Sequence, residues 1–335
     1  MHPDQIQNLR LRTKVIKALR ARLDAEGFLE VETPILHTVH GGASAHPFRT
    51  YINAYGEDLT LRIAPELYLK RLVVGGSGPV YELGRDFRNE GADATHNPEF
   101  TVLEAYRPYA DYVQMRELTE RLIKDAAQAV FGSVSLPLGR KASSERTVSD
   151  VSGPWRVVSV CDALSEALGR RVDVQTDFEE LLALAQQHGV RVHEGMGPGA
   201  IVEELYGELV EAHTVEPTFY TDFPAETSPL AAPHRSVPGL AERWDLVING
   251  MEMGCAYSEL ADPLVQRERL TEQSLKAASG DLEAMEVDED FLYALETGMP
   301  PTGGLGLGVD RLVMLLAQTQ IRGVLSFPFV KPECS

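Results

Sequence analysis

Two arginines stand three residues apart in the stretch YELGRDFRNEG, which starts at Tyr81 and has the pattern of a strand followed by a polar loop. A guanidinium group on a rigid strand can make paired hydrogen bonds to a phosphate or a carboxylate. Because side chains alternate along a strand, Arg85 and Arg88 point to opposite faces. The pattern therefore predicts one ligand-binding arginine and one structural arginine, with an edge-strand charge pattern as the alternative.

A carboxylate interrupts an apolar strand face in the run EFTVLEAY. Alternation places Glu104 on the same face as Phe100 and Tyr106. A buried carboxylate is costly unless a cation or hydrogen-bond donors meet it. Glu104 is therefore predicted either to pair with an internal arginine, Arg88 or Arg107, or to receive a positively charged ligand.

Alternating glycines clear one strand face near the end of the chain. Gly304, Gly306 and Gly308 lie in GGLGLGVDRLVML, and Arg311 follows where the chain enters a helix. Such a face lets a flat ligand or another backbone approach closely. A dinucleotide-binding fingerprint fits badly, because the spacing is G-x-G-x-G and no βαβ unit follows. Tight strand packing is the other alternative.

Composition limits the partners that these groups can serve. The 335 residues, 44% of them apolar, are enough for one large domain or two ordinary ones. The net charge of −19 argues against a broad nucleic-acid-binding surface, so such a partner would need a local basic patch. No apolar run of roughly 18 residues and no secretory signal is present. The sequence therefore predicts a cytoplasmic protein without a membrane partner.

The cysteines exclude two common frameworks. Cys161, Cys255 and Cys334 are odd in number and far apart, so neither a disulfide scaffold nor a zinc-ligand pair is indicated. Any metal would be held by carboxylates.

The elements that must position these residues follow from apolar periodicity and stop signals. Helices are predicted over residues 5–26, 65–74, 114–130, 263–279 and 288–297, and again after the glycine-rich strand. Strands are predicted over residues 28–36, 81–88, 99–106, 218–223 and 243–254. Residues 139–153 are predicted to form a surface loop. From about 160 to 215 the pattern is helical, with Asp177 and Glu180 spaced as a capping box. The whole predicts an α+β fold carrying a small helical insertion.

Several of these strings occur together and in order in one known family. GFLEVETPIL, GGASAHPF, RIAPELYLKRL, YELGRDFRNEG, HNPEFTVLEAYRPYADY, FYTDFPAETSPLA and GLGLGVDRLVML resemble the catalytic core of class II lysyl-tRNA synthetases, over about residues 8 to 332. The resemblance implies a single catalytic domain over 1–335, built on an antiparallel sheet flanked by helices. It also implies a homodimer joined near Pro34 and formation of lysyl-adenylate with ATP and Mg²⁺.

The same resemblance implies roles for individual residues. Arg88 is similar to the arginine that binds the ATP α-phosphate and the amino-acid carboxylate, and Arg311 to the one that binds the γ-phosphate. The remaining nucleotide contacts would be Glu90, His96 and Phe100. The amino-acid pocket would contain Gly42, Glu66, Arg88, Glu104, Tyr106, Cys255, Tyr257, Glu259 and Gly306. Asp245 and Glu252 match the positions that hold magnesium.

The chain also departs from that family. The family's N-terminal anticodon-binding domain has no counterpart ahead of the resemblance, so anticodon recognition is not expected. Cys255 and Ala256 replace an Asn-Gly pair, and Asp245 stands where glutamate is usual. A lone catalytic core and Tyr257 resemble the related ligases that attach lysine to elongation factor P, whereas Gly306 resembles the synthetases.

The sequence thus predicts ATP-dependent activation of lysine or a lysine-like amino acid, followed by transfer to a protein side chain or a small molecule. The protein acceptor would be of the elongation factor P type. Aminoacylation of tRNA, contacted at its acceptor end, is one alternative. A non-catalytic sensor that binds lysine and ATP is the other.

Overall fold

A computed structural model describes residues 3–139, 147–193, 195–278 and 284–330. Cys334 and most of the predicted loop, residues 140–146, lie outside these ranges. Within them, no helix is both long and apolar enough to cross a bilayer.

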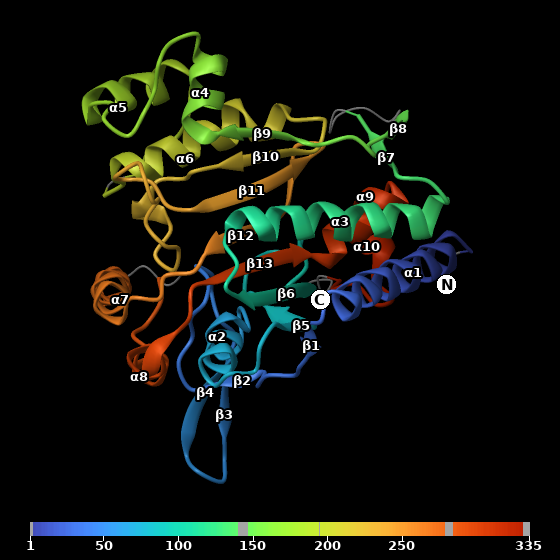
Figure 1. Ribbon diagram of the computed structural model, residues 1–335, viewed down its shortest axis with the longest axis horizontal. Helices are drawn as coiled ribbons and strands as arrows, with labels where there is room; N and C mark the ends of the chain where they lie inside the picture. The colour runs from blue at the N-terminus through green and yellow to red at the C-terminus, as the bar shows by residue number, and fades with distance from the viewer. Residues whose placement is uncertain (1–2, 140–146, 194, 279–283, 331–335) are drawn as a thin grey trace, which may run out of the picture.

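A mixed eight-stranded sheet forms the centre of the molecule (Figure 1). In spatial order its strands are β1 (Leu29–Glu30), β5 (Val80–Phe87), β6 (Glu99–Pro108), β13 (Thr302–Gly308), β12 (Met251–Ser258), β11 (Arg243–Ile248), β10 (Thr218–Thr221) and β9 (Arg156–Ser159). The six central strands are antiparallel, as predicted. The two edge pairs, β1 with β5 and β9 with β10, are parallel, which the sequence pattern did not predict. Parallel neighbours need a crossover connection, which α4–α6 supply between β9 and β10.

Ten helices and two smaller sheets surround this sheet in the described ranges. The helices are α1 (Pro3–Ala25), α2 (Glu66–Val74), α3 (Tyr112–Phe131), α4 (Val160–Leu168), α5 (Phe178–Gln187), α6 (Pro198–Leu209), α7 (Pro263–Ala278), α8 (Glu289–Gly298), α9 (Val309–Ala317) and α10 (Ile321–Val324). The small sheets pair β4 (Glu57–Leu61) with β2 (Leu36–His37) and β3 (Arg49–Ile52), and β7 (Ser135–Leu138) with β8 (Thr147–Asp150). The helices expected between 160 and 215 are α4 to α6, which share a second apolar cluster with Tyr220 of β10 and Val247 of β11.

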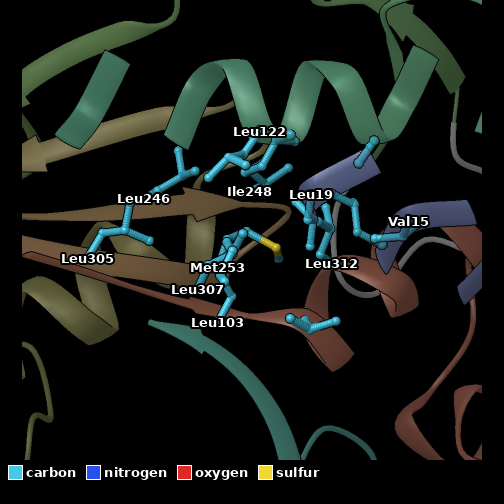
Figure 2. Packing of buried hydrophobic residues seen from close by; sticks show 14 of the residues in the cluster. Val15, Leu19, Leu103, Leu122, Leu246, Ile248, Met253, Leu305, Leu307 and Leu312 are labelled. Carbon is cyan, nitrogen blue, oxygen red and sulfur yellow. The ribbon is translucent and has the colours of Figure 1, made fainter. Parts of the chain in front are cut away.

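The main core determines which face of the sheet is free to form a site. Leu122 of α3 and Leu19 of α1 pack with Leu305 and Leu307 of β13 in one buried cluster (Figure 2). Side chains alternate along a strand, so the intervening glycines of β13 point to the opposite face. That opposite face carries the predicted ligand-binding residues.

Four local predictions need correction. The run 243–254 is two strands, because Asn249 and Gly250 both have positive φ (55° and 67°) and form a tight hairpin turn. The run 28–36 holds only the two-residue strand β1 and the first residue of β2, with Pro34 between them. Part of the predicted loop 139–153 is strand β8. The predicted capping box is only half present. Asp177 caps α5 through the Glu179 N–H, while the Glu180 side chain pairs with Arg170.

Candidate active site

The register of five neighbouring strands brings the predicted site residues into two rows. The first row consists of successive cross-strand partners on β5, β6, β13, β12 and β11: Glu82, Glu104, Gly306, Cys255 and Asp245. The second row lies two residues along on the same face: Val80, Tyr106, Gly304, Tyr257 and Arg243. The floor of the site is therefore a patch of the sheet surface.

A cavity of about 400 Å³ opens over these rows. Most of the predicted ligand-binding residues line it: Gly42, Glu66, Arg88, Glu90, His96, Phe100, Glu104, Tyr106, Glu252, Cys255, Tyr257, Gly306 and Arg311. Glu259 and Asp245 are not among its lining residues. The arrangement brings residues from opposite ends of the chain around one space, as the resemblance implied.

The two glycines in these rows, Gly304 and Gly306, have different surroundings. A β-carbon on Gly304 would overlap the Glu259 carboxylate and lie 2.5 Å from Tyr106 Cε1. A β-carbon on Gly306 would have no heavy atom within 4 Å, because it would project into the cavity. Gly304 therefore serves packing, whereas Gly306 leaves open volume between Glu104 and Cys255.

Arg85 and Arg88 point to different surroundings, as alternation predicted. Arg88 lines the cavity and lies over the Phe100 ring, 5.1 Å from its centroid. Its Nε is buried without a hydrogen-bond partner in the described part of the chain. Arg85 points elsewhere and pairs with Glu99 at 3.5 Å. Arg88 is thus a guanidinium held in place by stacking, with donors left for an anion.

Glu104 is a buried carboxylate in the cavity without a cation. It accepts a hydrogen bond from the Tyr106 hydroxyl at 3.0 Å, and no cation of the described residues lies within ion-pair distance of it. Burial, followed by the nearby charges of Asp86 and Glu66, holds the pKa of Glu104 well above its usual value. The predicted internal pair with Arg107 is wrong, because Arg107 pairs with Glu26 at 2.9 Å.

Lys70 forms ion pairs with two of the predicted site carboxylates, Glu66 and Glu259, and was not predicted from the sequence. Its fully buried ammonium contacts Glu66 at 2.5 Å and also pairs with Glu259. Burial alone would lower the pKa of Lys70, but Glu259 and then Glu66 raise it above its usual value. The spacing of Glu66 and Lys70, four residues apart on a helix, was the available signal. Because Lys70 compensates this pair, Glu104 is the carboxylate best placed to bind an external cation.

The predicted magnesium ligands lie on adjacent strands. Both Asp245 oxygens accept hydrogen bonds from Arg243, at 3.1 and 2.9 Å, and Arg243 also reaches Glu203 of α6 at 2.9 Å. Burial raises the pKa of Asp245 to about 7, with Arg243 opposing the shift and the charge of Glu252 adding to it. No three His, Cys, Asp or Glu side chains of the described ranges cluster as a metal site. A magnesium ion shared with phosphates needs only one or two protein carboxylates. Glu252 lines the cavity and is placed for that role, whereas Asp245 would first have to exchange Arg243 for the ion.

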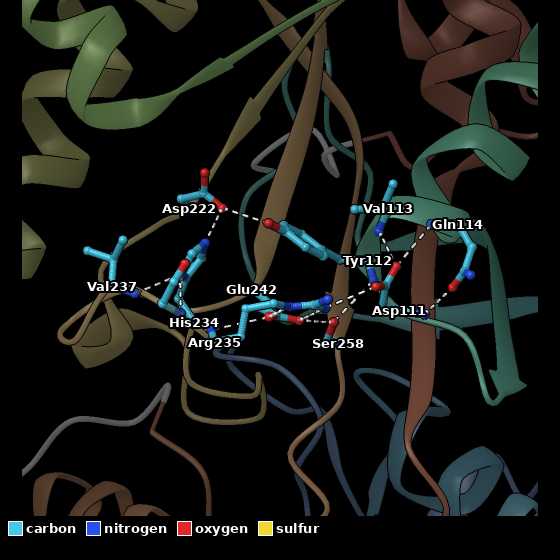
Figure 3. A network of polar contacts seen from close by, with 11 residues as sticks. Asp111, Tyr112, Val113, Gln114, Asp222, His234, Arg235, Val237, Glu242 and Ser258 are labelled. Atoms are coloured by element: carbon cyan, nitrogen blue, oxygen red, sulfur yellow. Dashed lines mark hydrogen bonds and ion pairs between the residues drawn. The ribbon is translucent and has the colours of Figure 1, made fainter.

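A polar network on the other face of the sheet supports the second row (Figure 3). Arg235 donates to Glu242 Oε2 at 2.8 Å and to Asp111 Oδ2 at 2.9 Å. The Ser258 hydroxyl donates to Glu242 and accepts from the Tyr112 N–H at 3.1 Å. Glu242 precedes Arg243, and Ser258 separates Tyr257 from Glu259. The network therefore fixes the strand ends that present these site residues.

The fold and the cavity define a class II synthetase domain, and comparison with known proteins agrees. Residues 1–331 match the family of class II tRNA synthetases (D, K and N), and the chain belongs to this family. Among its relatives is the lysylphosphatidylglycerol biosynthesis bifunctional protein LysX. The proteins of that name from Nocardia farcinica and Mycolicibacterium gilvum are 56% and 55% identical to this chain, in alignments that cover 99% of it. The chain spans only 29% and 30% of their respective lengths.

Proposed function

We propose that this protein activates lysine, or a lysine-like amino acid, by condensing it with ATP to an aminoacyl-adenylate. The observation that carries the proposal is the pairing of opposite charges in one cavity: Glu104 lacks a cation, and Arg88 has donors free for an anion. Lysine carries an ammonium group at one end and a carboxylate at the other. The names of the LysX relatives, which refer to a lysyl product, support the same amino acid.

The residues divide the reaction between them. Arg88 holds the lysine carboxylate against the α-phosphate, where a carboxylate oxygen attacks phosphorus and the bond to pyrophosphate breaks. Its fixed donors stabilise the charge that builds there. Glu104 and Tyr106 hold the side-chain ammonium, and Glu66 with the Gly42 carbonyl the α-amine.

The nucleotide is proposed to occupy the other end of the cavity. Phe100 stacks on adenine, Glu90 and His96 contact the nucleotide, and Arg311 binds the γ-phosphate. Asp245 and Glu252 would hold magnesium, which neutralises phosphate charge.

Amino-acid-dependent exchange of pyrophosphate into ATP tests this activation step. Exchange is expected with L-lysine or a basic analogue such as ornithine or β-lysine, and neutral amino acids should fail. If no basic or standard amino acid supports exchange at saturating magnesium, the non-catalytic sensor replaces the enzyme.

The acceptor is proposed to be a protein side chain or a small molecule, in a cytoplasmic reaction. The names of the relatives make a phosphatidylglycerol lipid one candidate small molecule, and a protein of the elongation factor P type is the other class of acceptor predicted from the sequence. Radiolabelled lysine and ATP can be offered separately to tRNA, to elongation factor P and to phosphatidylglycerol vesicles. Label in tRNA alone would favour the aminoacylation alternative.

We also propose a homodimer joined near Pro34. Leu29, Ile35 and Leu36 lie within five residues of this proline in the sequence, and their aliphatic side chains are 55%, 44% and 49% exposed. Sedimentation at micromolar concentration should give twice the chain mass. A monomer would contradict the dimer without touching the active-site assignment.

The two row glycines allow a matched pair of substitutions. Gly306→Ala adds a methyl group to open cavity, so it should leave the unfolding temperature almost unchanged but raise the KM for lysine by roughly tenfold. Gly304→Ala adds the same group against Glu259 and Tyr106, so it should destabilise the fold by about 1–3 kcal/mol. Thermal unfolding of both variants measures the stability change, and exchange kinetics measure the KM for lysine. Equal stability losses would show that both positions are packed.

Cys255 lines the cavity, and its sulfur lies 3.6 Å from the Tyr257 hydroxyl. Burial raises the pKa of the Cys255 thiol, which keeps it a protonated, weak hydrogen-bond donor. If the native substrate is lysine, Cys255→Asn should raise lysine affinity severalfold, the effect of about one neutral hydrogen bond. Exchange kinetics on lysine and its analogues measure this, with Ala256→Gly tested alongside for coupling. If the exchange kinetics of Cys255→Asn were unchanged for every substrate, Cys255 would not contact the bound amino acid.

A further inference from the structure

One carboxylate organises the loop before β6 and has no role so far. Asp93 Oδ1 accepts hydrogen bonds from the backbone N–H groups of Thr95 and His96, at 2.6 and 2.8 Å, and from the Thr95 hydroxyl at 3.0 Å. Asp93 Oδ2 lies 2.9 Å from His96 Nδ1. Burial raises the pKa of Asp93, but the hydrogen bonds from Thr95 and His96 together outweigh it and hold the pKa below its usual value. Asp93 is therefore an anion that only accepts hydrogen bonds.

The other ring nitrogen of His96 faces a group that only donates. Arg311 Nη2 lies 3.2 Å from His96 Nε2, while Arg311 Nη1 donates to the Glu252 carbonyl at 2.8 Å. A guanidinium cannot accept a hydrogen bond, so Nε2 must be unprotonated. Asp93 requires the proton on Nδ1 for the converse reason. Both partners therefore select the same neutral tautomer, and Arg311 is held at both of its terminal nitrogens.

We propose that Asp93 is a positioning residue, which fixes the Nδ1-protonated tautomer of His96 and so holds Arg311 in place for the terminal phosphates of ATP. The loop geometry gives the tautomer independently of any activity, whereas the role toward ATP rests on the proposed function. With the proton on Nε2, two donors would face each other, and Arg311 would have to move.

Asp93→Asn tests the tautomer directly. Its side-chain oxygen can keep the backbone turn at Thr95, but its amide N–H then faces His96 Nδ1 and should move the ring proton to Nε2. Nitrogen NMR of protein labelled with ¹⁵N-histidine reads the tautomer, and His96→Gln identifies the signals among the nine histidines. Wild type should show protonated Nδ1 and bare Nε2. Thr95→Val removes the hydroxyl that donates to Asp93 Oδ1 and also lies 3.0 Å from His96 Nδ1, but it keeps the Asp93 carboxylate. It therefore separates the carboxylate from the hydroxyl, and the tautomer should stay as in wild type.

The link to Arg311 is measured by nucleotide affinity. Asp93→Asn should raise the Kd and the KM for ATP by roughly tenfold, the effect of about one charge-assisted hydrogen bond. The KM for lysine should change less than about twofold, because the lysine end of the cavity does not involve this loop. A general folding defect would instead weaken both substrates.

Three results would overturn the proposal. If wild-type His96 is protonated on Nε2, the proposed tautomer is wrong. If Asp93→Asn changes the tautomer but leaves the ATP affinity unchanged, the tautomer does not position Arg311. Failure of the wild type to bind ATP would overturn both this inference and the proposed function. Absence of exchange with normal ATP binding would overturn the proposed function alone, and the calorimetric Kd and the NMR spectrum would still decide the role of Asp93.

Discussion

Arg88→Lys should lower the rate of lysine-dependent pyrophosphate exchange by roughly 100- to 1000-fold, the usual effect of removing one preorganised donor from developing charge. The lysine side chain introduced at position 88 keeps the positive charge but lacks the planar guanidinium group. In wild type the Nε of that group is buried and its face lies on the Phe100 ring. The loss should fall mainly on kcat, because the contact strengthens as the phosphorus is attacked.

The same strand supplies the control for this experiment. Arg85→Lys changes an arginine that lies outside the cavity and pairs with exposed Glu99, so its kinetics should stay within about twofold of wild type. Steady-state rates of lysine-dependent pyrophosphate exchange, measured on both variants, test whether Arg88 contacts the reacting groups. If Arg88→Lys behaved like Arg85→Lys, Arg88 would not contact the reacting groups.

Glu104→Gln should raise the KM for lysine at least roughly tenfold, because it removes a charge-assisted hydrogen bond to the side-chain ammonium. Glu99→Gln, on the same strand but half exposed, is the matched control and should leave the KM for lysine near wild type. Unchanged lysine kinetics in Glu104→Gln would remove this carboxylate from the pocket.

Glu104 also predicts the direction of a pH dependence. Its pKa in the free protein lies above the usual carboxyl value, so the carboxyl holds its proton at pH values where an exposed carboxyl is ionised. Lysine binding requires the anion, so the wild-type KM for lysine should rise as the pH falls through the raised pKa. Glu104→Gln cannot titrate and should lose that part of the profile. A parallel profile in both proteins would assign the dependence to another group.

Local patterns were sufficient to predict the side chains on the site face. Strand alternation placed Arg85 and Arg88 on opposite faces and marked Glu104 as a carboxylate that needs a cation, whereas the choice of Arg88 over Arg85 came from the family resemblance. The glycine run predicted an open strand face, although only the structure shows that Gly304 serves packing and Gly306 the cavity. Period-2 patterns succeed here because they depend on neighbours within one strand.

Charge compensation between distant elements could not be predicted in the same way. Lys70 neutralises Glu259 from almost two hundred positions away in the chain, and Arg243 engages both oxygens of Asp245. Which cation meets which carboxylate depends on tertiary packing, for which one sequence carries no periodic signal. The parallel edge strands were missed for a related reason, because their partners are set by crossovers and not by local pattern.

The two rows of the site also constrain when the protein can become active during its synthesis. β13 lies between β6 and β12, yet it is made after both of them. Until β13 leaves the ribosome, each of these strands has one unpaired edge open to a neighbouring nascent chain. The proposed activity should therefore appear only after β13 has inserted and α9 has followed with Arg311, and chains stalled shortly before residue 302 should be inactive and prone to aggregate.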